Sequence, residues 1–181
     1  MSPTALDKPG STEDRLRAIE DRLEICNLIA SHPAIADSLA MELLLGMFTP
    51  DGVLDGGPRG PIKIHERMGT DDPARREVMR EAAKMGLAHL STPPYIKLGK
   101  NTAVAFSYTA VTVRDPAAEA IAVPAHGTGQ GHRLFLIAGI RWDARRTENS
   151  WKLSRRKVVA CDGSDAPRDL AREVLNAVLV D

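Results

Sequence analysis

A carboxylate and an imidazole stand out in this chain because together they can move a proton. Large apolar side chains follow Asp37 at helical spacing, at Met41, Leu44 and Phe48. That spacing places the carboxylate on an apolar helix face, where it requires a partner or a proton of its own. His89 is the candidate partner, because imidazole is the usual general base in proteins. Plainer interpretations stay open: Asp37 caps the start of the second helix or faces water, and His89 is a hydrogen-bonded core histidine.

Three further side chains are candidates for contacting a substrate. His32 precedes Asp37 by five residues, and it either faces the same cavity or lies at the surface. Tyr108 and Thr109 point to opposite faces of a predicted strand, so only one of them can line a pocket, and the alternation does not say which. Arg156 either faces inward, where it can stabilise negative charge, or faces solvent.

The sequence predicts neither a metal site nor an organic cofactor. His126 and His132 flank a glycine-rich stretch over residues 127–131, but two histidines without a nearby carboxylate make a poor metal site. Predicted strands flank this stretch, whereas a dinucleotide-binding loop connects a strand to a helix. We therefore expect no metal and no cofactor.

The elements that position these residues begin with helices. Ser11 and Asp14 have the spacing of a capping box, and the apolar residues after them predict a helix to about residue 31. Pro33 predicts a break, because proline cannot donate a helical hydrogen bond. We expect a second helix over 34–47, ended by turn chemistry over 48–52.

The rest of the chain is predicted to be mostly strands. Short helical segments are expected over 62–68 and 74–85, and a last helix over 164–178. A hairpin loop is expected over 115–131. Alternation predicts a strand over 87–98 that Pro93 and Pro94 interrupt, followed by strands over 102–114, 132–143 and 150–162.

This order of elements is α+β rather than alternating α/β. We expect a strongly curved antiparallel sheet wrapped around the N-terminal helices, a cone that binds a ligand on its concave side, as in a cystatin-like α+β barrel. We expect residues 1–10 to be a disordered tail and residues 11–181 to form a single domain.

Composition excludes several classes of function. Among 181 residues, 24 Lys and Arg balance 24 Asp and Glu, which argues against nucleic acid and anionic membranes as partners. No run approaches the roughly 18 apolar residues of a membrane span. The two cysteines do not make a disulfide scaffold, and the N-terminus lacks a signal-peptide pattern. We expect a cytoplasmic protein.

Two stretches resemble the SnoaL-like family within the nuclear-transport-factor-like superfamily. Residues 15–54 resemble its opening: an amphipathic helix, a break, a helix with one Asp, then Phe48-Thr49-Pro50-Asp51-Gly52. The stretches 142–146 and 151–156, each beginning at a tryptophan, resemble the last hairpin of that family. The resemblance covers most of residues 12–162.

The resemblance implies an activity. Several dehydratases and a hexachlorocyclohexane dehydrochlorinase of this superfamily use an Asp–His dyad as base, and Asp37 and His89 fall where that dyad is expected. The position of His32 is often a Tyr or Lys that assists the leaving group, and Arg156 matches an Arg that helps dehydrochlorinase-like members.

We therefore expect a cofactor-free lyase, acting like a dehydratase on a small hydrophobic cyclic, polyketide- or steroid-like molecule. The alternatives are a non-catalytic ligand-binding or oligomerisation module of the same fold, and an isomerase. Sheet packing in the superfamily further implies a homodimer or homotrimer.

Overall fold

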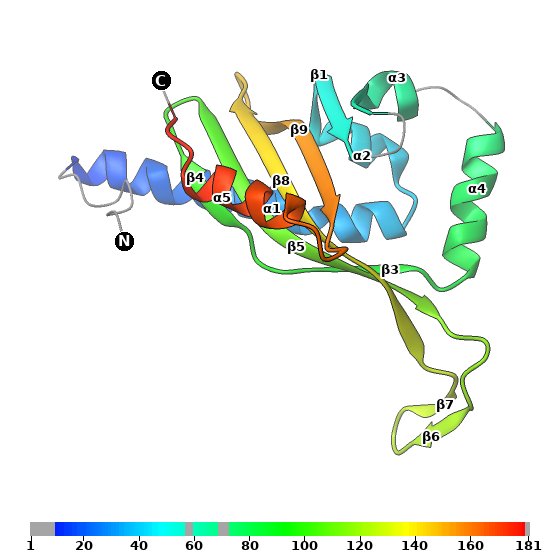
Figure 1. Cartoon of the computed structure of the whole chain (residues 1–181). Coiled ribbons are helices and arrows are strands. Elements are labelled where there is room, and N and C mark those ends of the chain that lie inside the picture. The colour runs from blue at the N-terminus through cyan, green and yellow to red at the C-terminus, as the bar shows by residue number, and fades with distance from the viewer. Residues whose placement is uncertain (1–9, 57–59, 69–72, 180–181) are drawn as a thin grey trace.

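The computed structural model describes residues 10–56, 60–68 and 73–179 (Figure 1). The tail predicted over residues 1–10 therefore lies, apart from Gly10, outside the described residues. No helix in these described ranges is both long and apolar enough to cross a membrane.

Helix α1 (Thr12–Asp37) is one continuous helix. The predicted capping box is confirmed: the Ser11 side chain accepts from the backbone of Asp14, whose carboxylate accepts from the backbone of Ser11. The predicted break at Pro33 is wrong, because the helix runs through this residue. Its buried side chains, which include Ile25, Ile29 and His32, form one stripe, and packing of that stripe outweighs the hydrogen bond that proline cannot donate.

The chain turns at the end of α1 instead. Leu39 adopts a positive φ of 56°, and the Ala40 N–H donates to the Ile35 carbonyl at 3.2 Å. This is a Schellman-type helix end, with leucine where glycine is usual. The second helix, α2 (Met41–Gly46), is therefore short, and Asp37 belongs to the C-terminal end of α1 rather than to a helix over 34–47.

The main sheet is curved and unclosed, with the strand order β2-β1-β9-β8-β5-β3 and with β4 paired to β5. The strand predicted over 102–114 is confirmed, and the one over 87–98 is interrupted as predicted, forming β3 and β4. All pairs are antiparallel except β1 with β9, which is parallel, so the sheet is not the wholly antiparallel one expected. The strands are β1 (Phe48–Asp55), β2 (Ile62–Lys63), β3 (Ala88–Ser91), β4 (Tyr95–Leu98), β5 (Thr102–Arg114), β8 (His132–Arg146) and β9 (Trp151–Ala160).

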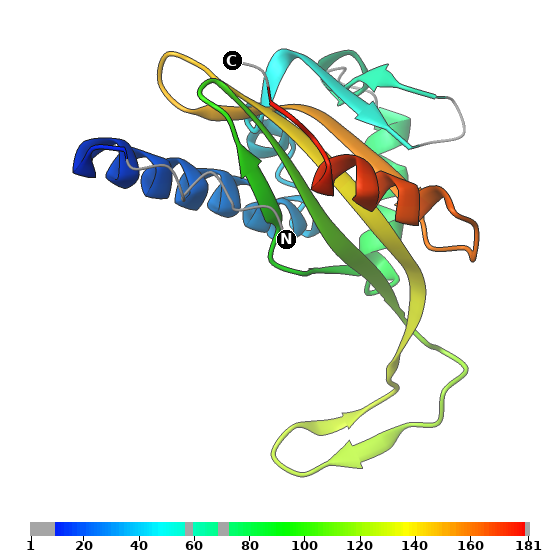
Figure 2. The same cartoon turned by 60° about the vertical axis from the view of Figure 1, so that its left-hand side comes forward.

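Different helices cover the two faces of this sheet (Figures 1 and 2). On the inner face α1 packs against β3, β4 and β9, over a core that includes Ile25, Ile29, Trp142 and Leu153. On the outer face lies α5 (Ala166–Leu175), which contacts β8 most. Because side chains alternate along a strand, the register of each pair determines which residues share the inner face.

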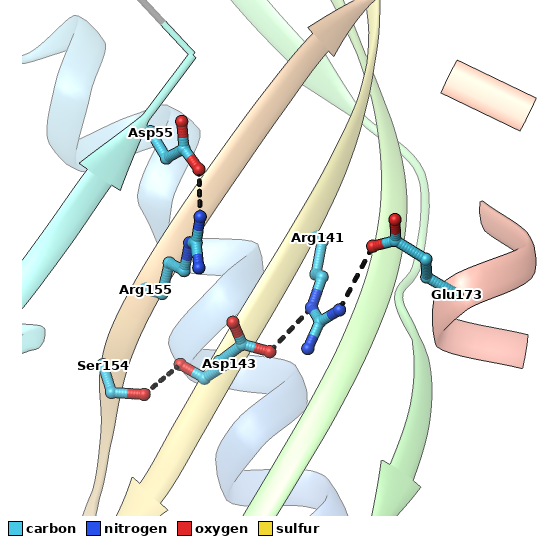
Figure 3. A network of polar contacts seen from close by, with 6 residues as sticks. All are labelled: Asp55, Arg141, Asp143, Ser154, Arg155 and Glu173. Atoms are coloured by element: carbon cyan, nitrogen blue, oxygen red, sulfur yellow. Dashed lines mark hydrogen bonds and ion pairs between the residues drawn. The ribbon is translucent and has the colours of Figure 1, made fainter. Parts of the chain in front are cut away.

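The outer face carries a polar network (Figure 3). The Arg141 guanidinium donates to Asp143 at 2.8 Å and to Glu173 of α5 at 3.3 Å. Arg155 pairs with Asp55 across β9 and β1. Charged residues on this face therefore bind one another and hold α5 against the sheet.

The remaining elements lie around one end of the sheet. Helix α3 (Ile64–Met68) contacts β1, and α4 (Pro73–Lys84) precedes β3. The hairpin predicted over 115–131 contains the small strands β6 (Ile121–Val123) and β7 (Gly127–Gly129) and projects from the body beyond β5 and β8 (Figure 2).

Candidate active site

The structure brings Asp37 and His89 into contact. Asp37 Oδ1 lies 2.5 Å from His89 Nδ1, and its Oδ2 accepts from the backbone N–H of His89 at 2.9 Å. The end of α1 and the start of β3 thus present the two side chains to each other, although 52 positions separate them in sequence. Both side chains are about three-quarters buried, with exposed fractions of 22% for His89 and 26% for Asp37.

This contact fixes the orientation of the imidazole. An ionised carboxylate can only accept hydrogen bonds, so the proton of the neutral ring lies on Nδ1 and the lone pair on Nε2. No described residue forms a hydrogen bond with Nε2. The ring therefore presents an acceptor nitrogen whose direction the carboxylate determines, which is the arrangement of a general base.

A cavity of about 190 Å³ opens beside the pair. It lies between the end of α1, helix α4 and strand β3. Most of its lining is apolar, so an apolar part of a ligand that enters the cavity would be removed from water, which favours binding next to His89. The lining residues are Ala36, Asp37, Leu39, Met79, Ala82, Ala83, Leu87 and His89.

His32 lies on the inner side of α1, one and a half turns before Asp37. It is 8% exposed and stacks edge-on against Trp142, with 5.2 Å between the ring centroids. Burial, the positive charge of Arg156 and repulsion by His89 when that ring is protonated lower the pKa of His32 to about 2. At neutral pH this imidazole is therefore uncharged and can donate one hydrogen bond and accept another.

Arg156 faces inward. The register pairs it with Trp142, and its guanidinium carbon lies 5.4 Å from the centroid of that ring. Burial lowers the pKa of Arg156 to about 10, which leaves the side chain charged at neutral pH. The side chain lies deep in the protein, although the residue keeps some accessible surface.

The structure does not bring Tyr108 into this group. Tyr108 is exposed and shares the outer face with Phe106, against which it stacks edge-on at 5.0 Å. Thr109 takes the inward position and exchanges a hydrogen bond with Ser91 at 2.8 Å. The alternation left this choice open, and the burial of Thr109 together with the exposure of Tyr108 decides it.

Sequence reasoning missed one member of the site. Trp142 connects His32 to Arg156 by ring contacts on both, and its indole N–H donates to Ser107 at 3.0 Å. Its alternation with Ile140 and Ala138 was the signal, since these residues share one face of β8. In the described ranges, no three His, Cys, Asp or Glu side chains form a group that could hold a metal ion.

Comparisons with known proteins place this geometry in context. The model of the SnoaL-like domain family matches residues 17–157. An NTF2-like protein with a cystatin-like fold from Novosphingobium aromaticivorans is 26% identical, with a TM-score of 0.73 over 92% of this chain and 98% of that one. A search of curated proteins found no match.

More distant structures share the fold. A putative scytalone dehydratase from Novosphingobium aromaticivorans is 14% identical, with a TM-score of 0.55 over 82% of this chain and 87% of that one. A putative aromatic ring hydroxylase from the same organism is 21% identical, with a TM-score of 0.56 over 79% and 90% of the two chains. At these identities the likeness concerns the fold.

Proposed function

Because the chain belongs to the SnoaL-like domain family, we propose that it is a cofactor-free lyase that uses His89 as base and Asp37 to orient it. His89 Nε2 removes a carbon-bound proton from a small, largely hydrophobic cyclic substrate of polyketide or steroid type. The electrons of the broken C–H bond form the new double bond, and a leaving group departs. When that group is hydroxide, the proton taken by His89 returns to it, and water is released.

The observation that supports this proposal is the 2.5 Å contact between Asp37 and His89 beside an apolar cavity. A non-catalytic binding module of this fold has no need for the contact. The likeness to a putative scytalone dehydratase agrees with elimination as the reaction class. An isomerase would begin with the same proton abstraction but return the proton to another carbon, so it is the second candidate.

The test is a screen with small cyclic β-hydroxy ketones. Elimination is followed by the ultraviolet absorbance of the conjugated enone and by the mass of the water lost. Exchange of the proton next to the carbonyl in D₂O, followed by NMR, reports abstraction alone. Exchange together with a migrated double bond and no loss of water would replace the lyase with the isomerase.

Asp37→Asn tests the role of the carboxylate. The amide nitrogen that this substitution introduces would donate to His89 Nδ1, so the ring proton moves to Nε2 and the base is lost. Turnover should fall by about 10²–10⁴-fold, the usual contribution of a general base. Asp143→Asn is the matched control, because Asp143 is a mostly buried, ion-paired carboxylate on the outer face (Figure 3). Equal turnover in Asp37→Asn and wild type would exclude the mechanism.

A further inference from the structure

Arg156 is a deeply placed cation that no described residue neutralises. Its neighbour Arg155 points to the outer face and pairs with Asp55, and Arg141, Arg145 and Arg146 of β8 each bind a carboxylate. Arg156 has neither a hydrogen bond nor an ion pair with any residue in the described ranges, and its Nε is closed off from solvent.

Such a cation is costly to bury. Removing a charged group from water without a partner is costly, and stacking over one indole recovers only part of that cost. Trp142 therefore offsets only part of the cost. An anion that binds the guanidinium would recover the remainder, which is why an inward arginine without an ion pair suits an anionic ligand.

The surroundings of Arg156 suit a planar oxyanion. The uncharged ring of His32 contacts the same indole, Trp142, as the Arg156 guanidinium, and it can donate a hydrogen bond without adding charge. The inward hydroxyls of Ser107 and Thr109 are bound to Trp142 and Ser91 and carry no charge. The carboxylate of Asp37 is bound to His89 and, among the described residues, forms no ion pair with the guanidinium.

We propose that Arg156 and His32 form an anchoring subsite for a carboxylate, and that the substrate of the Asp37–His89 pair is a small cyclic organic acid. The inference rests on the proposed function only in assigning this ligand to the same reaction. The carboxylate binds to the guanidinium and takes part in no bond change. It holds the apolar ring of the substrate so that a C–H bond reaches His89 Nε2.

Benzoate is the probe, and benzamide is its uncharged match in shape. Trp142 lies at the subsite, so binding is followed by intrinsic tryptophan fluorescence and checked by calorimetry. Wild type should bind benzoate at least tenfold more tightly than benzamide. Equal affinities for the two would overturn the proposal without any variant being made.

Three substitutions test which arginine binds the carboxylate. Arg156→Gln should weaken benzoate binding about tenfold or more and leave benzamide binding unchanged. Arg155→Gln is the matched control on the outer face and should bind benzoate as wild type does. Arg156→Lys keeps a charge but loses the planar fork, so its affinity should lie between those of wild type and Arg156→Gln. Wild-type affinity in Arg156→Gln would overturn the proposal.

Asp37→Asn separates this inference from the proposed function, because its guanidinium subsite is intact. It should bind benzoate as wild type does while losing turnover. Charge-selective binding that requires Arg156, in a protein that transforms no cyclic acid or ketone, would refute the lyase and leave the subsite standing. Turnover that requires Asp37, without a preference for benzoate over benzamide, would refute the subsite and leave the lyase standing.

Discussion

His32→Gln should change how the stability of this protein depends on pH. The imidazole is buried against Trp142 and near Arg156, and its pKa falls from 6.5 to about 2 in the folded state. In the unfolded chain the same ring titrates normally, near 6.5. Below that pH the unfolded state therefore binds a proton that the folded state refuses, so protonation favours unfolding.

The sign and size follow from the two pKa values. Above about pH 7.5 the ring is neutral in both states and contributes nothing to the pH dependence. As the pH falls through 6.5, stability is lost, and at pH 5 protonation of the unfolded ring costs about 2 kcal/mol. At pH 5 this cost depends on the unfolded pKa alone, provided that the folded pKa stays below about 4.

Urea unfolding followed by circular dichroism at pH 8 and pH 5 measures the effect. From pH 8 to pH 5, the unfolding free energy of His32→Gln should fall by about 2 kcal/mol less than that of wild type. His126→Gln is the matched control, since His126 is exposed on the projecting hairpin, and its loss should equal that of wild type. Parallel losses in wild type and His32→Gln would refute the assignment of a neutral, buried His32.

Four further substitutions test the packing of the fold, each by urea unfolding. Gly56→Ala should cost about 2–4 kcal/mol, because Gly56 has φ 135° and an added Cβ would lie 2.5 Å from the Val158 carbonyl oxygen. Gly127 also has a positive φ but open space around it, so Gly127→Ala should cost only about 1 kcal/mol. Equal losses of unfolding free energy in the two variants would contradict a steric clash at Gly56. Arg156→Met should raise the unfolding free energy by about 1 kcal/mol or more, because it replaces a buried, unpaired cation with an apolar side chain and leaves no opposite charge without a partner. A clear decrease in unfolding free energy would mean that the guanidinium is neutralised in the folded protein. Asp21→Asn should cost about 2–3 kcal/mol, since Asp21 is 7% exposed and paired with an arginine of β8, and a negligible loss would show that the pair is not formed.

Local patterns predicted much of the fold. The capping box at Ser11, the strand over 102–114 and the interruption at Pro93 and Pro94 each depend on residues close in sequence, and the structure contains all three. The predicted break at Pro33 is wrong because long-range contacts, not neighbouring residues, decide the structure there. Local propensity disfavours proline inside a helix, but the buried stripe that contains Ile29 and His32 packs over long range and keeps the helix intact.

The site was predictable in part. Residue type and spacing singled out Asp37 and His89, and the fold brings the two side chains together. The inward choice of Thr109 over Tyr108 was not predictable, because a strand of alternating residues has two faces and only its partners decide which one is buried. The position of Trp142 between His32 and Arg156 depends on the register between β8 and β9, which no local pattern encodes.

The second hydrogen bond of Asp37 affects the behaviour of the protein in solution. Strand β3 ends the sheet order, so one of its sides is a free edge on which the strand of another molecule could add. On that side the Asp37 carboxylate already occupies the backbone N–H of His89. The carboxylate that contacts the His89 ring therefore also protects the edge against intermolecular strand addition. Asp37→Asn keeps an oxygen that can accept this bond, whereas Asp37→Ala would expose the N–H and should promote aggregation.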